Sequence, residues 1–84
     1  MADPPRSSYQ NLRKEKADLI KADQHIADGE GRITAQGARI KRLRADGHDT
    51  AQSEKLLATF REILAEWYAH RELILRRIND LENR

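Results

Sequence analysis

The chain has 84 residues, of which 36% are charged and 5% aromatic, and its formal net charge is +2. So short a chain allows one small domain, which builds a sufficient core only through a very regular helical interface or through oligomerisation. The sequence contains no cysteine, which excludes disulfides and thiolate metal sites, and no apolar run approaches the roughly 20 residues that cross a bilayer.

Residues 1–7 are expected to form a flexible arm, because the prolines at positions 4 and 5 disfavour helix before the second proline. This segment has no apolar stretch behind a positively charged end, so we expect no signal peptide and a cytoplasmic location. Ser7 and Gln10 have the spacing of a capping box, which predicts that a helix begins near Ser8.

A first helix is predicted over residues 8–45. Its weak point is the segment 28–31, because Gly29 and Gly31 each cost about 1 kcal/mol relative to alanine inside a helix. A turn there would give three helices. A ladder of apolar residues seven positions apart keeps its phase through this segment, which favours one continuous helix, straight or kinked. The ladder consists of Leu12, Leu19, Ile26, Ile33 and Ile40.

A loop is predicted over residues 46–49. Gly47 suits the left-handed conformation that often follows the last residue of a helix. Asp49, with Gln52 three residues later, has the spacing of a capping box for the next helix, and Thr50 is the neighbouring candidate for the cap.

A second helix is predicted over residues 50–82, with core-facing positions spaced by three and four. The short loop makes the two helices antiparallel neighbours, so the expected fold is all-α, a coiled-coil-like two-helix hairpin. In order, the ladder is Leu57, Phe60, Leu64, Trp67, Arg71, Ile74, Ile78 and Leu81.

Folding the two ladders about the loop predicts their register. Ile26 then lies level with Arg71, and Trp67 faces Gly29, so that large residues of the second helix meet small ones of the first. The same register predicts three flanking ion pairs of opposite sign. They are Lys16 with Glu82, Asp18 with Arg77 and Arg44 with Glu54. The predicted core and interface residues are Ile26, Ile33, Leu57, Phe60, Leu64, Trp67, Arg71, Ile74 and Ile78.

The second helix is apolar over a wider face than the first helix covers. Leu56 and Ile63 lie on one flank of the ladder, Tyr68 and Leu75 lie on the other, and Leu73 lies further out. A broad apolar face indicates burial on more than one side. We therefore expect a homodimer, in which two hairpins form a four-helix bundle and the second helix meets its own copy.

Two histidines are the residues nearest to a chemical site. His25 and His70 lie near each other across the hairpin in the predicted register, and Asp28 and Glu66 are each one turn away. Such groups on facing helices can hold a metal, but there is no Glu-x-x-His motif, and two interfacial histidines are the simpler interpretation. We assign no catalytic residue, cofactor or metal ligand and expect no enzymatic activity.

The ladder position Arg71 allows two interpretations. Its guanidinium group could pair with Asp28 or with a carboxylate of a second subunit, which would fix the register. Alternatively, the aliphatic stem packs while the charged head reaches water.

The densest positive charge lies at the end of the first helix, at Arg39, Lys41, Arg42 and Arg44. Dimeric helical hairpins can bind RNA through a helix face, so a small regulatory RNA-binding protein is the alternative function. A solvated helix end is the simpler interpretation, since phosphate binding usually requires more net charge than this chain carries. The leading expectation is a structural or protein-interaction module with no nucleic-acid or membrane partner.

The string Leu-Arg-Ala-Asp-Gly-His-Asp-Thr at residues 43–50 is the most specific local pattern in the chain. With three further segments it resembles short, mostly uncharacterised helical-hairpin proteins of alphaproteobacteria, over roughly the stretch 22–75. The resemblance implies a distinct small family and carries no established activity and no functional residues. The further segments are Asp-Gln-His-Ile-Ala-Asp-Gly-Glu at 23–30, Leu-Leu-Ala-Thr-Phe-Arg-Glu at 56–62 and Ala-His-Arg-Glu-Leu-Ile-Leu at 69–75.

Overall fold

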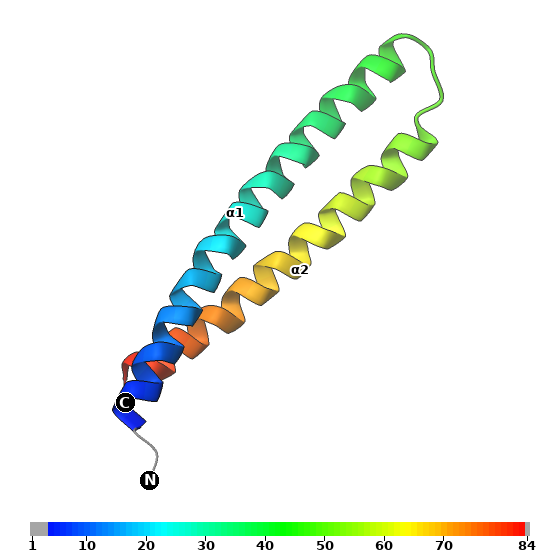
Figure 1. Cartoon of the computed structure of the whole chain (residues 1–84). Coiled ribbons are helices and arrows are strands. Elements are labelled where there is room, and N and C mark those ends of the chain that lie inside the picture. The colour runs from blue at the N-terminus through cyan, green and yellow to red at the C-terminus, as the bar shows by residue number, and fades with distance from the viewer. Residues whose placement is uncertain (1–3, 84) are drawn as a thin grey trace.

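A computed structural model describes the backbone of residues 4–83 and the side chains from Tyr9 onward. Two helices, α1 (Pro4–Ala45) and α2 (Ala51–Glu82), make up all the regular structure of the described residues. They lie side by side and antiparallel, joined by a loop at one end, and both termini lie at the other end (Figure 1). The hairpin measures 69 × 18 × 14 Å. The expected all-α helical hairpin is confirmed.

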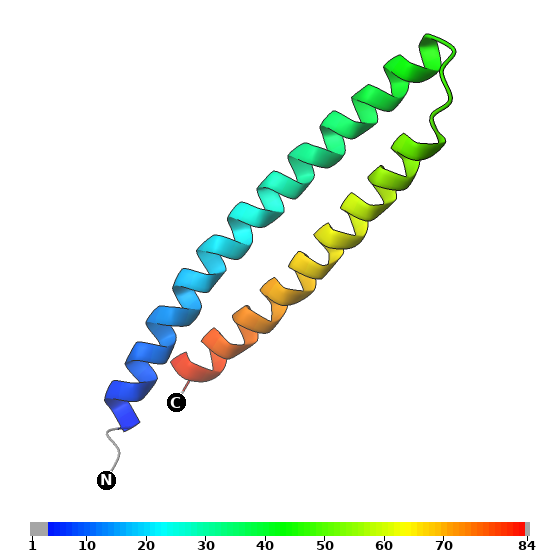
Figure 2. The ribbon, with the colours of Figure 1, turned by 45° about the vertical axis from the view of Figure 1, so that its right-hand side comes forward.

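The start of α1 differs from the expectation. The helix begins at Pro4, four residues before the predicted start near Ser8, so residues 4–7 do not belong to an arm. Proline is well tolerated in the first turn of a helix, because its fixed φ suits the helix and its missing N–H would have no partner there. The remaining part of the predicted arm, residues 1–3, lies outside the described residues. As a result α1 extends past the end of α2 (Figure 2).

Helix α1 is continuous through the glycine-containing segment 28–31, as the phase of the ladder predicted. The alternative of a turn and three helices is wrong. The residue that faces Gly29 differs from the one that the predicted register placed there. A Cβ atom at Gly29 would lie 3.2 Å from Cδ1 of Leu64, so Leu64 covers this glycine in place of Trp67.

At the loop, the end of α1 and the start of α2 are each capped by hydrogen bonds. The N–H of His48 donates to the carbonyl of Leu43 and the N–H of Gly47 to that of Arg44, at 2.9 and 3.1 Å. This is the Schellman pattern, and Gly47 takes the left-handed φ of 77° that it requires, as predicted. On the other side, Oδ1 of Asp49 accepts the N–H of Ala51 at 3.0 Å.

The hydrophobic core is a single line of side chains between the helices. Among the described residues, the buried apolar side chains are Ala22, Ile26, Ile40, Ile74 and Ile78. Gln36 is also buried, and its amide Nε2 donates to the carbonyl oxygen of Ser53 at 2.9 Å, so this polar group in the seam is satisfied. Half-buried positions complete the predicted core set: Ile33, Leu57, Phe60, Leu64, Trp67 and Arg71.

Candidate interaction surface

One edge of the hairpin, here called the polar edge, is joined by polar contacts from end to end. On α1 its members Lys16, Glu30 and Arg44 are fourteen residues apart, and so are their partners Glu54, Tyr68 and Glu82 on α2. Fourteen residues are close to four helical turns, so each set lies on one face of its helix. The contacts are Lys16 Nζ to Glu82 Oε2 at 3.4 Å, Arg44 to Glu54 Oε1 at 2.7 Å, and a hydrogen bond from the Tyr68 hydroxyl to Glu30.

Two of the three predicted ion pairs, Lys16 with Glu82 and Arg44 with Glu54, are confirmed on the polar edge. The third is wrong. Arg77 pairs with Glu15 at 3.7 Å instead of with Asp18. Asp18 accepts from Nζ of Lys14, one turn away on the same helix, at 3.1 Å.

Arg71 belongs to the polar edge as well. Its Nε donates to Oδ1 of Asp23 at 2.7 Å, and its side chain is half-buried. The predicted partner Asp28 is therefore wrong, because it lies five residues from Asp23 and so about 140° away around α1. The hydrogen bond to Asp23, reinforced by the charge of that carboxylate, raises the pKa of the Arg71 guanidinium above its ordinary value.

Tyr68 and Glu30 give the polar edge its one contact between a phenol and a carboxylate. The phenol hydroxyl donates to Oε1 of Glu30. The pKa of Tyr68 is raised, first by this hydrogen bond, then by partial desolvation and by the negative charge of Glu30. A deprotonated Tyr68 would lose the hydrogen bond and face a like charge.

The opposite edge of α2, here called the apolar edge, consists of Leu56, Ile63, Trp67 and His70. Leu56, Ile63 and His70 are seven residues apart, and Trp67 lies four residues from Ile63, so these four share one face. This face lies roughly 140° around the helix from Tyr68. Leu56 and Ile63 are 45% and 44% exposed, and Leu73, which is 46% exposed, lies about 60° beyond His70 around the helix.

Trp67 forms the centre of the apolar edge. Its indole ring stacks on His25 of α1, with ring centroids 4.1 Å apart and planes 15° apart. His70 meets the same indole edge-on, with a centroid distance of 5.6 Å. Glu66, Trp67 and His70 line a shallow groove of about 340 Å³.

The structure thus brings His25 of α1 and His70 of α2 into contact with one indole ring. Of the two imidazoles, that of His25 stacks on the indole, whereas that of His70 is nearly perpendicular to it. In the part of the chain that the structure describes, no group of three or more histidine, aspartate or glutamate side chains is placed to hold a metal ion.

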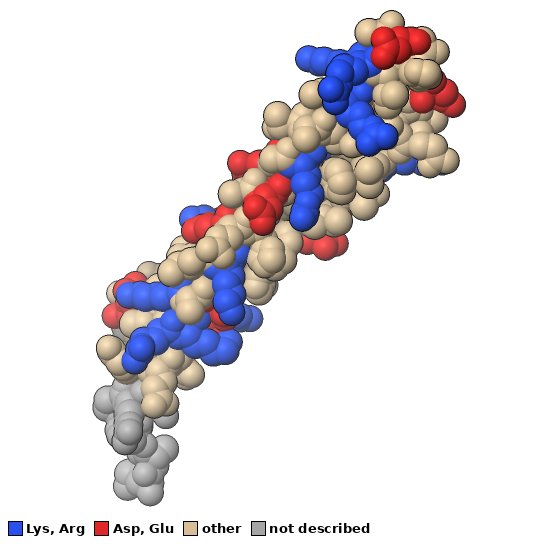
Figure 3. Space-filling model, turned by 45° about the horizontal axis from the view of Figure 1, so that its top comes forward, with Lys and Arg blue, Asp and Glu red and all other residues tan. Residues whose placement is uncertain are grey.

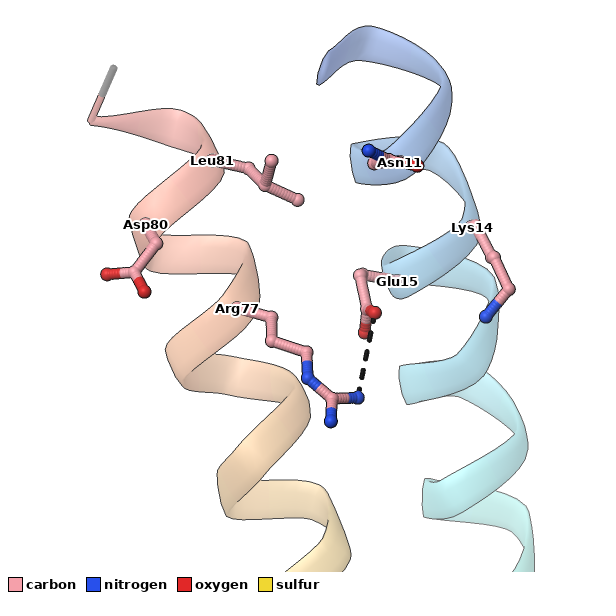
Figure 4. A pocket seen from close by; sticks show the side chains of 6 residues that line it. All are labelled: Asn11, Lys14, Glu15, Arg77, Asp80 and Leu81. Carbon is pink, nitrogen blue, oxygen red and sulfur yellow. Dashed lines mark ion pairs between the residues drawn. The ribbon is translucent and has the colours of Figure 1, made fainter. Parts of the chain in front are cut away.

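A second groove, of about 430 Å³, lies near the open end of the hairpin. Figure 4 shows Glu15 of α1 and Arg77 of α2 pointing toward each other inside it, with Asp80 and Leu81 one turn further along α2. Oε2 of Glu15 is buried without a hydrogen-bond partner. Its other oxygen takes the long contact to Arg77, so this ion pair holds the helix ends together across the groove.

The predicted nucleic-acid contacts lie at the loop end. Arg39, Lys41 and Arg42 are exposed, whereas Arg44 is engaged by Glu54. Lys41 follows Arg39 by two residues, which is about 200° around the helix. The basic side chains therefore surround the end of α1 and do not form one face. Positive and negative side chains are interspersed along the surface shown in Figure 3.

Comparisons of the chain with protein-family models, with curated proteins and with solved structures find no match. No helix in the described part of the chain is long and apolar enough to cross a membrane. The polar edge and the apolar edge are accordingly the features of the hairpin that bear on its function.

Proposed function

We propose that this protein is a non-enzymatic protein-interaction module that acts as a homodimer, with two hairpins packed into a four-helix bundle. The apolar edge carries this proposal. Two large aliphatic side chains, Leu56 and Ile63, stand nearly half exposed on one face of α2, beside the indole that stacks on His25. Burial of such side chains stabilises by about 1.5–3 kcal/mol each.

The size of the core supports the same conclusion. A single line of buried side chains between two helices is a small core for a chain of 84 residues. Domains of this length are marginally stable alone and commonly gain stability by association. A second hairpin on the apolar edge would turn one line of core residues into a bundle interior.

The test is the oligomeric state with matched variants. We expect sedimentation equilibrium to show a dimer at micromolar concentration. Ile63→Lys, which puts a charge on the apolar edge, should yield a monomer that remains helical. Ile20→Lys is the control, because Ile20 is equally aliphatic and 61% exposed but lies on the far side of α1. A compact, stable wild-type monomer would overturn the proposal.

The alternative function, RNA binding at the loop end, is favoured by one observation, the exposure of Arg39, Lys41 and Arg42. Binding to phosphates releases counterions, so it weakens steeply as salt rises. Titration with RNA and DNA at two salt concentrations separates the two functions. The interaction-module proposal predicts no binding even at low salt, whereas salt-sensitive binding that is lost on replacing Arg39 and Arg42 would support the alternative.

A further inference from the structure

We propose that association of the two hairpins is controlled by pH, and that protonation of His25 and His70 separates them in mildly acidic solution. This inference rests on the proposed homodimer and adds to it the regulation of the interface. Its basis is the position of the two imidazoles. His70 is a member of the apolar edge, and His25 lies on the same side of the hairpin because it stacks on Trp67.

In the single hairpin both imidazoles are accessible to water. His25 and His70 are exposed, and in the part of the chain that the structure describes neither ring takes part in a hydrogen bond or an ion pair. Water alone therefore hydrates a charged imidazole there. An isologous contact places the same surface of both copies in the interface, so docking would remove this water from four imidazoles. Loss of water without a new partner penalises the charged form of a side chain much more than the neutral form.

The charged groups around the two imidazoles leave this penalty uncompensated. Lys21 and Asp28, each one turn from His25 on α1, have opposite charges, so their effects on that imidazole oppose each other. Glu66, one turn from His70 on α2, lines the same groove, but its carboxylate is exposed and forms no ion pair with the imidazole in the described part of the chain. At the same level of the hairpin, the remaining charged groups pair with each other on the polar edge. They are Asp23 and Arg71.

Two arginines on the same side of α1 add to the effect. Arg32 and Arg39 follow His25 at intervals of seven residues, so they share its face of the helix. Both are exposed. Protonated imidazoles would therefore add positive charge to a side of the hairpin that already carries two guanidinium groups. Because the contact is isologous, the added charges of the two copies would also repel each other.

The direction of the pH dependence follows from linkage. The single hairpin binds protons that the dimer excludes, so a lower pH shifts the equilibrium toward single hairpins. Histidine side chains ordinarily titrate near pH 6.5 and carboxylates near pH 4, so the range from about pH 8 to about pH 5.5 charges imidazoles while carboxylates stay ionised. If each copy excludes one proton, the dimer dissociation constant rises by about a hundredfold over this range.

Sedimentation equilibrium at several pH values in this range tests the proposal. The wild-type dissociation constant should rise as the pH falls. His48→Gln is the matched control, because His48 is the third histidine of the chain and is exposed in the loop, outside the apolar edge. It should respond as the wild type does. The double variant His25→Gln with His70→Gln is neutral at every pH at these positions and should keep a nearly constant dissociation constant, and each single variant should lose part of the response.

The outcomes separate the control by pH from the dimer itself. A wild-type dimer with a constant dissociation constant would overturn the control by pH and leave the dimer intact. So would a full response in the double variant, or a lost response in His48→Gln. If the double variant fails to associate at about pH 8, the single variants decide, and a full response in both would overturn the assignment to His25 and His70. Circular dichroism checks that the hairpin stays helical, since unfolding in place of dissociation would also overturn the inference. A wild-type monomer at every pH would overturn both proposals.

Discussion

At the scale of single residues, the glycines of α1 differ in what surrounds them. A Cβ atom at Gly31 would have nothing within 4 Å, whereas at Gly29 it would lie 3.2 Å from Cδ1 of Leu64. Alanine favours helix over glycine by about 1 kcal/mol. Gly31→Ala should therefore raise the free energy of unfolding by about that amount, and Gly29→Ala should raise it less, because Leu64 must move. Urea denaturation of the two variants measures the difference, and equal effects would show that Leu64 does not constrain Gly29.

The titration of Tyr68 gives a second test at this scale. The raised pKa means that the folded protein holds the phenol proton more tightly than the unfolded chain does. The stabilisation from this contact is therefore complete below the unfolded value of about 10 and is lost as the pH rises through the folded pKa. In a Tyr9→Phe background, where Tyr68 is the remaining tyrosine, tyrosinate absorbance should show a midpoint above about 10. Glu30→Gln should lower this midpoint, and an unchanged midpoint would contradict the assigned cause.

Two residue partners could not be read from the sequence, and the reasons are physical. Heptad positions place Trp67 opposite Gly29, but a wide, flat indole gains more by stacking on His25, one turn away, and Leu64 covers the glycine. Arg71 likewise takes Asp23 in place of Asp28. Side-chain reach and ring geometry decide such choices within a register that periodicity otherwise predicts.

At the scale of the helices, the start of α2 rests on Asp49. Its carboxylate accepts the N–H of Ala51, whereas Thr50, at the N-cap position itself, makes no side-chain capping bond. Loss of a cap typically costs about 1 kcal/mol. Asp49→Ala should therefore destabilise the hairpin by about that amount in urea denaturation, and Thr50→Ala should have little effect. Asp49→Asn keeps an acceptor and should retain most of the stability, and a larger loss in Thr50→Ala would contradict this assignment.

The helices themselves were largely predictable. The seven-residue ladder predicted a continuous α1 despite Gly29, and Gly47 marked its end. The start at Pro4 was not predicted. Proline disfavours helix at the residue before it, but it is well tolerated in the first helical turn. Sequence alone does not say which of these two effects prevails. The seven-residue spacing of Leu56, Ile63 and His70 is evident in the sequence. Only the structure shows that the other edge of α2 is occupied by polar contacts with α1.

At the scale of the whole molecule, the proposed association makes stability depend on protein concentration. When folding and dimerisation are coupled, the partner acts as a ligand of the folded state, so the melting temperature rises with concentration. Wild-type protein and Ile20→Lys should both show this rise in circular dichroism melts over a hundredfold dilution series. Ile63→Lys should melt at one temperature throughout, and a concentration-independent wild type would contradict the coupling.

The difference between the two edges also limits how far association can proceed. A hairpin that bound another copy on each of its two edges would assemble side by side into an open-ended polymer. In the proposed dimer the polar edge, whose contacts run from Lys16 with Glu82 to Arg44 with Glu54, would take no part, so each hairpin would bind one other copy. An isologous contact between two such hairpins buries the apolar edge of both copies. In the proposed dimer the surface ion pairs, individually weak contributors to stability, would act mainly by limiting the assembly to two hairpins.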